Sequence, residues 1–243
     1  MTVSDLQFAE SKHRYTDPRT GKRLVSVTSV VGNFDSGDKL GAGAGAAVKL
    51  TKLGIDYRKE WNDKKDLGSR IHANIGDWAL GRSTEVLGSD DPWMDGFQAF
   101  CDATKPVWLE TERAVVCSNG RAGGRFDLIG EFEWNGSRDF WLLDPKTGKP
   151  YESELELQLA GYADADGMIV YDENGMAVGL EPMPYFARWG GLYLDGSGKA
   201  TLVEVAKPPQ DGSRTRGEVQ EAAKAAFRSL LEVRLWHEER RKA

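Results

Sequence analysis

Residues 124–149, GRFDLIGEFEWNGSRDFWLLDPKTGK, form the stretch that decides the expected fold. Two largely apolar runs, 124–134 and 139–146, are separated by a turn signal, and this arrangement predicts two strands joined in a hairpin. An acid interrupts the apolar pattern of each run, Asp127 in the first and Asp144 at the end of the second. Because an unpaired buried carboxylate costs several kcal/mol, these two acids mark the hairpin as a candidate site.

The first strand has a predictable division into two faces. Alternation places Phe126, Leu128 and Phe132 on one face, and Asp127 with Ile129 on the other. The aromatic and leucine face is expected to pack on the core. An acid at the position of Asp127 is also typical of the solvent face of a hairpin, and the residues alone leave that alternative open.

The second strand ends in Asp144-Pro145-Lys146. Residues two apart on a strand point to the same side and lie about 6.5–7 Å from each other along the chain. Pro145 lacks a backbone donor, which predicts an edge or an end of the sheet at this point. Asp144 and Lys146 can therefore converge on one small volume that also holds a metal ion. The alternative is a surface ion pair, worth about 0–1 kcal/mol.

The segment upstream of the hairpin, residues 57–81, has the periodicity of a helix. Its apolar stripe consists of Leu67, Ile71, Ile75, Trp78 and Ala79. His72 lies in this helix, with Gly68 four residues before it and Gly76 four residues after it. Small neighbours along one helix row allow close approach to a sheet or to a metal. A half-exposed helix histidine without a ligand role is the alternative.

A helix is also expected downstream of the hairpin, from about Ser153. Ser153 and Glu156 have the spacing of a capping box, although the leucines alternate between residues 155 and 159 as in a strand. Gln158 and Tyr162 are four residues apart and so share one face of such a helix. An ordinary polar helix face would show the same pattern.

The remaining periodic segments complete a mixed α/β (α+β) chain with a central mixed sheet flanked by helices. They predict a hairpin in residues 1–35 that runs into a strand or a helix start, and the following further elements: a helix at 92–104, a strand at 108–118, a hairpin of 184–194 with 199–206, and a long C-terminal helix at 217–241.

The whole chain, residues 1–243, is expected to form one domain. Its parts are a β/helical N-terminal extension (1–56), a core (57–206) and a C-terminal helical part (207–243). The Gly-rich stretch 38–53 lacks the Gly-Lys-[Ser/Thr] ending of a phosphate-binding loop. A Gly/Ala-rich helix or a loop is the favoured interpretation of that stretch.

Composition excludes several classes of protein. The 32 basic and 38 acidic residues give a net charge of −6, which argues against a basic coat over the whole surface but allows a local basic groove. Two cysteines are too few for a disulfide scaffold or a four-thiolate site. No apolar run long enough for a membrane helix and no signal-like N-terminus is present. We therefore expect a cytoplasmic protein that does not associate with membranes.

These motifs, taken in order, resemble the PD-(D/E)XK nuclease superfamily, and within it the RecB-like and phage-type exonuclease branch. The resemblance covers about residues 25–170 and includes the early segment VSVTSVV (25–31). It rests on LGSRIHANI with His72, GRFDLIGEF with Asp127, LLDPKTGK with Asp144 and Lys146, and LQLAGYADA with Gln158 and Tyr162. It implies a restriction-endonuclease-like core. Members with an iron–sulfur cluster use four cysteines, so none is expected here.

The resemblance also implies a metal centre. His72, Asp127 and Asp144 would be ligands of one or two Mg²⁺ or Mn²⁺ ions, since carboxylates suit Mg²⁺ and an imidazole favours Mn²⁺. Asp144 takes the place of the Glu that many members of the superfamily have. Asp127, Asp144 and Lys146 would be the catalytic residues, with Lys146 orienting or deprotonating the attacking water.

Further residues are implied around that centre. Gln158 and Tyr162 would position the scissile strand or a metal-bound water. Glu112 and Arg125 are possible additional members of the site, although Glu112 can equally face solvent. Phosphate contacts require cations, and the candidates are Arg113, Arg121, Arg125, Lys149 and the segment 214–216.

The implied function is a metal-dependent DNA exonuclease of phage or bacterial recombination or replication. DNA would be the substrate, and a single-strand annealing protein or a recombinase a possible partner. The alternatives are a structure-specific or defence-related endonuclease of the same fold, a catalytically silent nuclease fold that binds DNA or protein, and an unrelated α+β protein with incidental acids. Neither the strand polarity nor the oligomeric state follows from the sequence.

Overall fold

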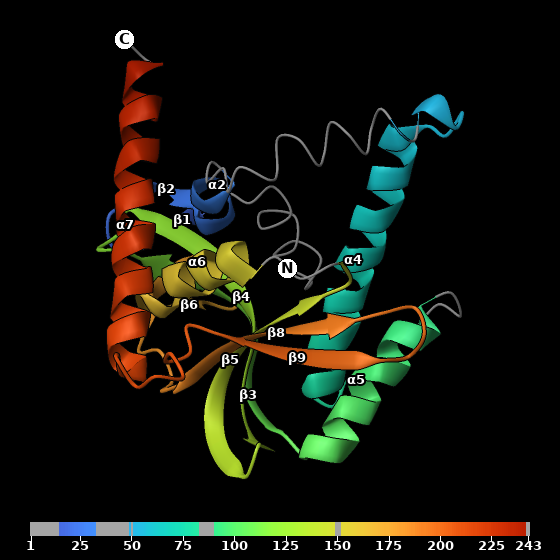
Figure 1. Ribbon diagram of the computed structural model, residues 1–243. Helices are drawn as coiled ribbons and strands as arrows, with labels where there is room; N and C mark the ends of the chain where they lie inside the picture. Colours follow the sequence, from blue (N-terminus) through green and yellow to red (C-terminus); the bar gives the residue numbers. More distant parts are fainter. Residues whose placement is uncertain (1–14, 33–48, 50, 83–89, 149–151, 242–243) are drawn as a thin grey trace.

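A nine-stranded mixed sheet forms the centre of the computed structural model, which describes residues 15–32, 49, 51–82, 90–148 and 152–241 (Figure 1). The strands are β1 (Tyr15–Thr16), β2 (Arg23–Ser26), β3 (Val107–Cys117), β4 (Ala122–Trp134), β5 (Ser137–Lys146), β6 (Ala165–Tyr171), β7 (Ala177–Glu181), β8 (Arg188–Leu194) and β9 (Ala200–Val205). The described helices are α2 (Val27–Val31), α4 (Tyr57–Ala79), α5 (Asp91–Thr104), α6 (Glu152–Ala163) and α7 (Arg216–Arg240).

The main path of the sheet runs β7-β6-β3-β4-β5-β8-β9. Neighbours along it are antiparallel except for β5 and β8, which are parallel. β2 also pairs in parallel with β4, at Val25–Ala122 and Ser26–Gly123. The edge of β4 that pairs with β2 at residues 122–123 pairs with β5 from Leu128 onward. The same edge of one strand therefore holds two different partners.

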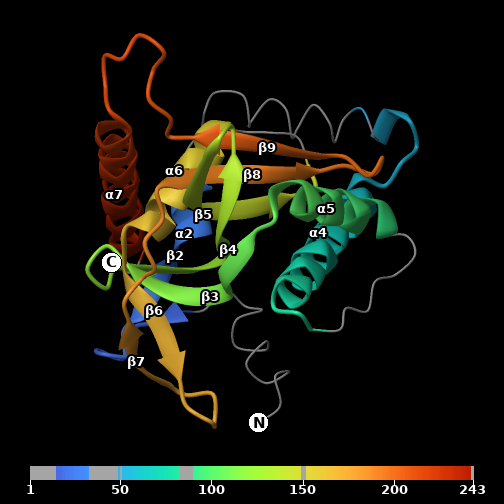
Figure 2. The same cartoon turned by 90° about the horizontal axis from the view of Figure 1, so that it is seen from below.

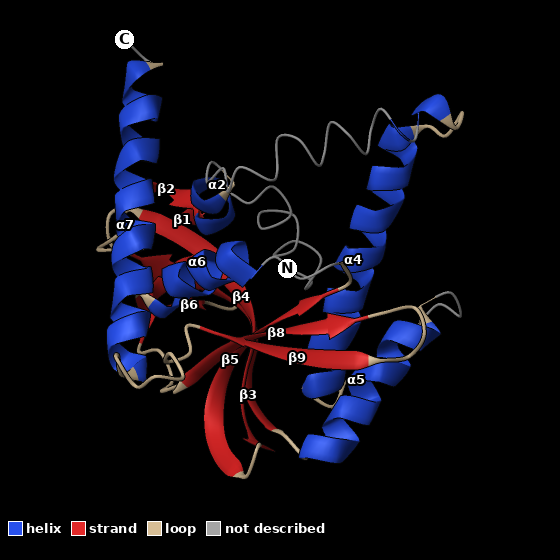
Figure 3. Ribbon diagram, viewed as in Figure 1, coloured by secondary structure: helices blue, strands red, loops and turns tan. Residues whose placement is uncertain are grey.

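Helices cover both faces of the sheet, as Figures 2 and 3 show from two directions. On one face α2, α6 and α7 pack over a buried cluster that includes Val27, Leu159 and Phe227. On the other face α4 and α5 pack over a second cluster that includes Ile75 and Phe97. This arrangement confirms the expected α/β class and the central mixed sheet flanked by helices.

Local sequence signals explain where the helices begin and end. The carboxylate of Asp56 accepts hydrogen bonds from the backbone N–H groups of Arg58 and Lys59 at the start of α4. Pro92 stands in the first turn of α5. α7 begins with a capping box formed by Thr215 and Glu218. The predicted helices 57–81, 92–104 and 217–241 are confirmed within one or two residues at each end.

Two local predictions were wrong, and one hairpin was not predicted. Ser153 lies inside α6, which already begins at Glu152, so it is not the cap of that helix. The hairpin of β6 and β7 was missed, although Asn174-Gly175 between its strands is a hairpin turn signal. Residues 184–187 lie outside β8 because that strand begins at Arg188. The Gly-rich stretch 38–53 lies largely outside the described residues.

The predicted faces of β4 hold only in part. Leu128 and Phe132 pack in the cluster under α4 and α5, but Phe126 packs with Ile129 in the cluster under α6. The alternation breaks at Asp127, where the neighbouring residue of β3, Glu112, has a φ of 51° between two regular pairs. A left-handed residue in one strand disturbs the pleat of the ladder beside it, and here it does so next to a predicted site residue.

None of the described helices combines the length and the apolarity that crossing a lipid bilayer requires.

Candidate metal centre

His72, Asp127 and Asp144 converge from three elements, α4, β4 and β5. One ligand atom from each of the three side chains lies within 4.8 Å of the others. Nδ1 of His72 is 3.1 Å from Oδ1 of Asp127. Lys146 completes the group, with its Nζ 2.7 Å from Oδ2 of Asp144. The structure thus brings together the four residues that the sequence motifs singled out.

The end of β5 positions Asp144 and Lys146. The last pair between β5 and β4 is Leu143 with Leu128, while the pairing with β8 continues through Lys146. Pro145 therefore lies where β5 has parted from β4, and its missing donor costs no hydrogen bond with that strand. Asp144 and Lys146 flank it on one side of the chain, as the two-residue spacing predicts.

Two glycines bring α4 close to the sheet around His72. A Cβ on Gly76 would lie 3.1 Å from Cγ of Glu112, and a Cβ on Gly68 would lie 3.5 Å from Oγ1 of Thr147. The first distance is shorter than ordinary side-chain packing and the second is an ordinary contact. The predicted close approach of this helix row is confirmed, and it places His72 against the acid of β4.

The carboxylate of Asp144 is buried without satisfying hydrogen bonds. Its side chain is 1% exposed, and among the described residues its one close polar contact of ion-pair length is the ammonium of Lys146, which does not have the angles of a hydrogen bond. Burial raises the pKa of Asp144, and this effect outweighs the ammonium of Lys146, while the charge of Asp127 raises it further. A divalent cation would add positive charge beside this buried carboxylate and would coordinate its oxygens, so the residues present fit a bound metal.

Asp127 and His72 behave as a charged pair. Burial is the largest single influence and opposes the charge on each, but their mutual attraction and hydrogen bond, together with smaller contributions from Asp144 to both and from Lys146 to Asp127, outweigh it. Together these interactions lower the pKa of Asp127 and raise the pKa of His72 to about 9. Without a metal, the positively charged imidazolium of His72 therefore partly neutralises the acids, a role that a bound metal ion would take over. Binding of a metal through His72 would release this proton.

Lys146 connects the acids to helix α6. Burial alone would lower its pKa, yet the charges of Asp144 and Asp127 raise it. Its Nζ donates a hydrogen bond of 3.4 Å to Oε1 of Gln158, and Nε2 of Gln158 donates one of 3.4 Å to the hydroxyl of Tyr162. Gln158 and Tyr162 thus share one helix face, as predicted, and form a continuous polar path away from Lys146.

Tyr162 lies at the buried end of this path. Burial raises the pKa of its phenol, and the charges of Asp127 and Asp144 add to the effect. The hydroxyl therefore stays protonated at neutral pH. A Cβ on Gly124 of β4 would come within 2.5 Å of the ring, so a glycine at that position is what allows Tyr162 to approach the sheet.

Glu112 and Arg125 lie beside the centre rather than in the group of potential ligands found among the described residues. Oε2 of Glu112 is 2.7 Å from Nε of Arg125. Glu112 holds a left-handed backbone conformation, which is uncommon for a residue with a side chain and is found frequently at functional sites. Both roles predicted for this pair stay predictions.

Tyr193 is a neighbour of the centre that the sequence motifs missed. It pairs with Lys146 in the parallel register of β5 and β8, and its phenol contributes to the electrostatic environment of that lysine. A Cβ on Gly191 would lie 2.8 Å from the Tyr193 ring and 2.6 Å from Leu155. The paired glycines 190–191 were the available signal, because glycine inside a strand marks a close approach.

Most of the arginines predicted to bind phosphate form ion pairs with acidic residues of the protein itself. Arg113 pairs with Glu110 and Glu181, and Arg121 with Glu232. Arg216 pairs with Glu204, and Arg214 donates to the carbonyl of Glu218. Lys149 lies outside the described residues. These side chains are therefore poorer candidates for phosphate contacts than their charge alone suggested.

Comparison with known proteins adds no assignment. No protein-family model matches the chain, and no curated protein matches its sequence.

Proposed function

We propose that this protein is a metal-dependent deoxyribonuclease of the PD-(D/E)XK type that degrades DNA as an exonuclease. The observation that carries the proposal is the buried, unsatisfied carboxylate of Asp144, with Asp127 and His72 beside it and Lys146 2.7 Å away. Two carboxylates, an imidazole and one ammonium suit phosphodiester hydrolysis better than an acyl or a redox reaction, since a phosphodiester carries negative charge throughout.

Asp127, Asp144 and His72 would hold one or two Mg²⁺ or Mn²⁺ ions. When bound, such an ion supplies a nucleophilic water at neutral pH and neutralises charge on the phosphate. The protein orients this group: β4 and β5 fix the two carboxylates, and the pairing of His72 with Asp127 fixes the imidazole. His72 would have to lose its proton to serve as a ligand of such an ion beside Asp127.

Lys146 remains charged in the resting site because both acids raise its pKa. Its Nζ lies between Asp144 and Gln158, where it orients the attacking water and stabilises charge that develops on the phosphate. Gln158 holds the ammonium from the side of α6, and the protonated hydroxyl of Tyr162 holds Gln158. These two residues position Lys146 and the scissile strand.

The preference for DNA ends, and a role in phage or bacterial recombination or replication, rest on the resemblance of the motifs to the phage-type exonuclease branch. The proposal places the enzyme in the cytoplasm with its DNA substrate. A single-strand annealing protein or a recombinase is the proposed partner, because such a partner uses the strand that an exonuclease exposes.

The experiment is cleavage of end-labelled linear DNA, single- and double-stranded, beside a closed circle, with Mg²⁺, Mn²⁺ or EDTA. Wild type is compared with Asp144→Asn and Lys146→Ala, and with Asp195→Asn as an acid outside the site. Metal-dependent loss of the linear substrates alone, abolished in the first two variants, is the expected result. Cutting of the circle would show that the protein is an endonuclease and not an exonuclease. Absence of metal-dependent cleavage would exclude both activities.

A further inference from the structure

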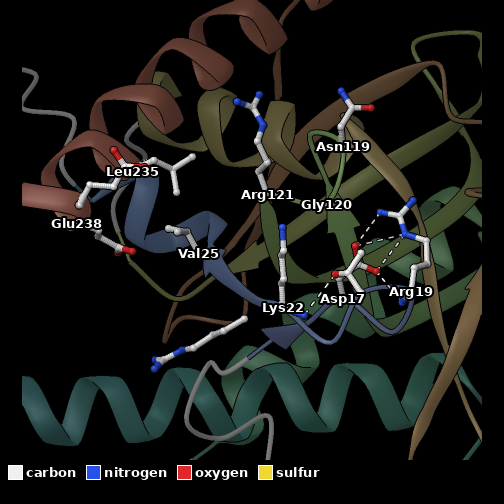
Figure 4. Close-up of a pocket in the computed structure, with 12 residues that line it drawn as sticks. Asp17, Arg19, Lys22, Val25, Asn119, Gly120, Arg121, Leu235 and Glu238 are labelled. Carbon is white, nitrogen blue, oxygen red and sulfur yellow. Dashed lines mark hydrogen bonds and ion pairs between the residues drawn. The ribbon is translucent and has the colours of Figure 1, made fainter. Parts of the chain in front are cut away.

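A basic groove lies between the β1–β2 hairpin, the β3–β4 turn and the C-terminal half of α7 (Figure 4). It consists of a cavity of about 880 Å³ and one of about 400 Å³, which share the lining residues Arg23, Val25 and Glu238. Six basic side chains line the two cavities against three acidic ones, on a chain with a net charge of −6. The basic residues are Arg19, Lys22, Arg23, Arg121, Arg234 and Arg241.

The cations of this groove fall into two groups. Arg19 binds Asp17 and Asp166, Arg121 pairs with Glu232, and Arg234 pairs with Glu238. Lys22, Arg23 and Arg241 are exposed and form no ion pair with the other described residues. Figure 4 shows Lys22 reaching from the hairpin into the space beside the turn that carries Arg121. Asp166 and Glu232 neutralise cations of the groove without lining it, and Glu239 also lines the larger cavity. Lys22, Arg23 and Arg241 therefore leave the groove only a small excess of positive charge.

Strand β4 connects the groove with the candidate metal centre. Ser26 and Ser29 line its smaller cavity, and Ser26 pairs with Gly123 of β4. Asp127 lies four residues further along that strand, a distance of about 13 Å at the rise of a β-strand. One DNA strand advances about 3.4 Å per nucleotide in a duplex, so about four nucleotides would span the separation.

We propose that this groove binds the phosphodiester backbone of a DNA strand whose end lies in the metal centre. The inference rests on the proposed function for the identity of the ligand and extends it to a second contact region. A polyanion with regularly spaced charges fits two contiguous cavities lined by cations along their length. The acidic remainder of the surface repels DNA, and this leaves a local groove as the route for the strand.

Binding is tested in EDTA, where no cleavage occurs, by the fluorescence anisotropy of labelled single-stranded and duplex oligonucleotides. The test variant is Lys22→Glu/Arg23→Glu. The matched control is Lys52→Glu/Lys207→Glu, which reverses two exposed lysines that line neither cavity. Thermal unfolding of all proteins checks that they are folded, and the milder Lys22→Gln/Arg23→Gln and Arg241→Gln variants serve if the charge reversal impairs folding.

The expected result is an affinity about tenfold or more lower for the test variant than for the control. The slope of log K against log salt, measured from about 50 to about 200 mM, should fall by about 1.4 for a single strand. The arm that shows this loss, single-stranded or duplex, identifies the form of DNA held. An affinity within about twofold of the control, with an unchanged slope, overturns the proposal.

A competition experiment separates DNA from an acidic protein segment. If oligo-glutamate displaces the oligonucleotide as well as unlabelled DNA of equal charge does, the groove is a protein-docking site and the proposal is wrong. Because these measurements need no metal and no cleavage, they are independent of the nuclease assay. If the protein binds DNA through the groove but does not cleave it, the proposed DNA-binding groove is supported and the proposed nuclease function is wrong.

Discussion

Asp17 and Asp144 each expose only about 1% of their surface, but their pKa values shift in opposite directions. Asp17 lies beside the groove in the β1–β2 hairpin, while Asp144 lies deep at the end of β5. Asp17 accepts hydrogen bonds from the backbone and the guanidinium of Arg19. The Arg19 side chain lowers the pKa of Asp17 more than burial raises it. Asp144 has the ammonium of Lys146 beside one oxygen but no well-aligned hydrogen bond among the described residues, and burial raises its pKa more than Lys146 lowers it. The fold itself supplies hydrogen-bond donors and a positive charge for Asp17, whereas the site of Asp144 is suited to a cation that binds from solution.

The largest expected effect is on catalysis. Asp144→Asn keeps the size of the side chain but removes a metal-binding charge, and a bound metal contributes several kcal/mol to such a reaction. Since about 1.36 kcal/mol corresponds to a factor of ten, metal-dependent cleavage should fall by about a thousandfold or more. Initial rates on end-labelled linear DNA measure this, and a variant that keeps a tenth of the wild-type rate would contradict the role of Asp144.

The same substitution should stabilise the metal-free protein, as expected for an acid that folding leaves unsatisfied. The folded pKa of Asp144 is about 7 against an ordinary value of 3.8. The native state therefore holds a proton between these values that the unfolded chain has lost, and stability declines as pH rises through this window. Asp144→Asn removes the decline.

Chemical unfolding in EDTA at pH 4 and at pH 8 checks this. The advantage of Asp144→Asn over wild type should be near zero at pH 4 and grow above it, by up to about 4 kcal/mol. Equal stabilities at both pH values would show that Asp144 is as well satisfied as Asp17.

A divalent ion should make wild type more stable than Asp144→Asn, the reverse of the order expected in EDTA. At an ion concentration about a hundredfold above its dissociation constant, wild type gains about 2.7 kcal/mol of stability. Asp144→Asn should gain much less, because it has lost one of the carboxylates of the site. Thermal unfolding with and without Mn²⁺ measures the gain. An equal rise of Tm in both proteins would place the ion elsewhere.

Asp17→Ala should act in the direction opposite to Asp144→Asn. It leaves the Arg19 backbone donor and guanidinium without their partner, at a cost of about 1–3 kcal/mol. Because Asp17 has a lowered pKa, its contribution is present above the ordinary carboxyl pKa and is lost as pH falls through the folded value. Urea unfolding at pH 7 and pH 3 tests both points, and a stabilising Asp17→Ala would remove the contrast between the two acids.

The contrast also shows what the sequence was able to predict. The spacing of Asp144 and Lys146 and the glycines around His72 were enough to bring these residues together, because two-residue and four-residue periods are local rules. Phe126 was assigned to the wrong face, because the left-handed Glu112 lies on a different strand and breaks the alternation from outside. The β6–β7 hairpin was missed although Asn174-Gly175 marks its turn, because helix α6 runs almost directly into β6. The opposite states of Asp17 and Asp144 depend on partners that only the fold reveals.

The shared edge of β4 has a consequence for how this protein reaches its native state. Val25 pairs with Ala122, so this short parallel ladder joins segments about one hundred residues apart, whereas β3, β4 and β5 meet through short turns. Contacts between distant segments form late, because the entropy of closing a long loop must be overcome first. We expect the acids of β4 and β5 to be in place before β2 and α2 arrive. Deleting residues 1–32 should leave a sheet that assembles quickly and exposes an unpaired strand edge prone to association.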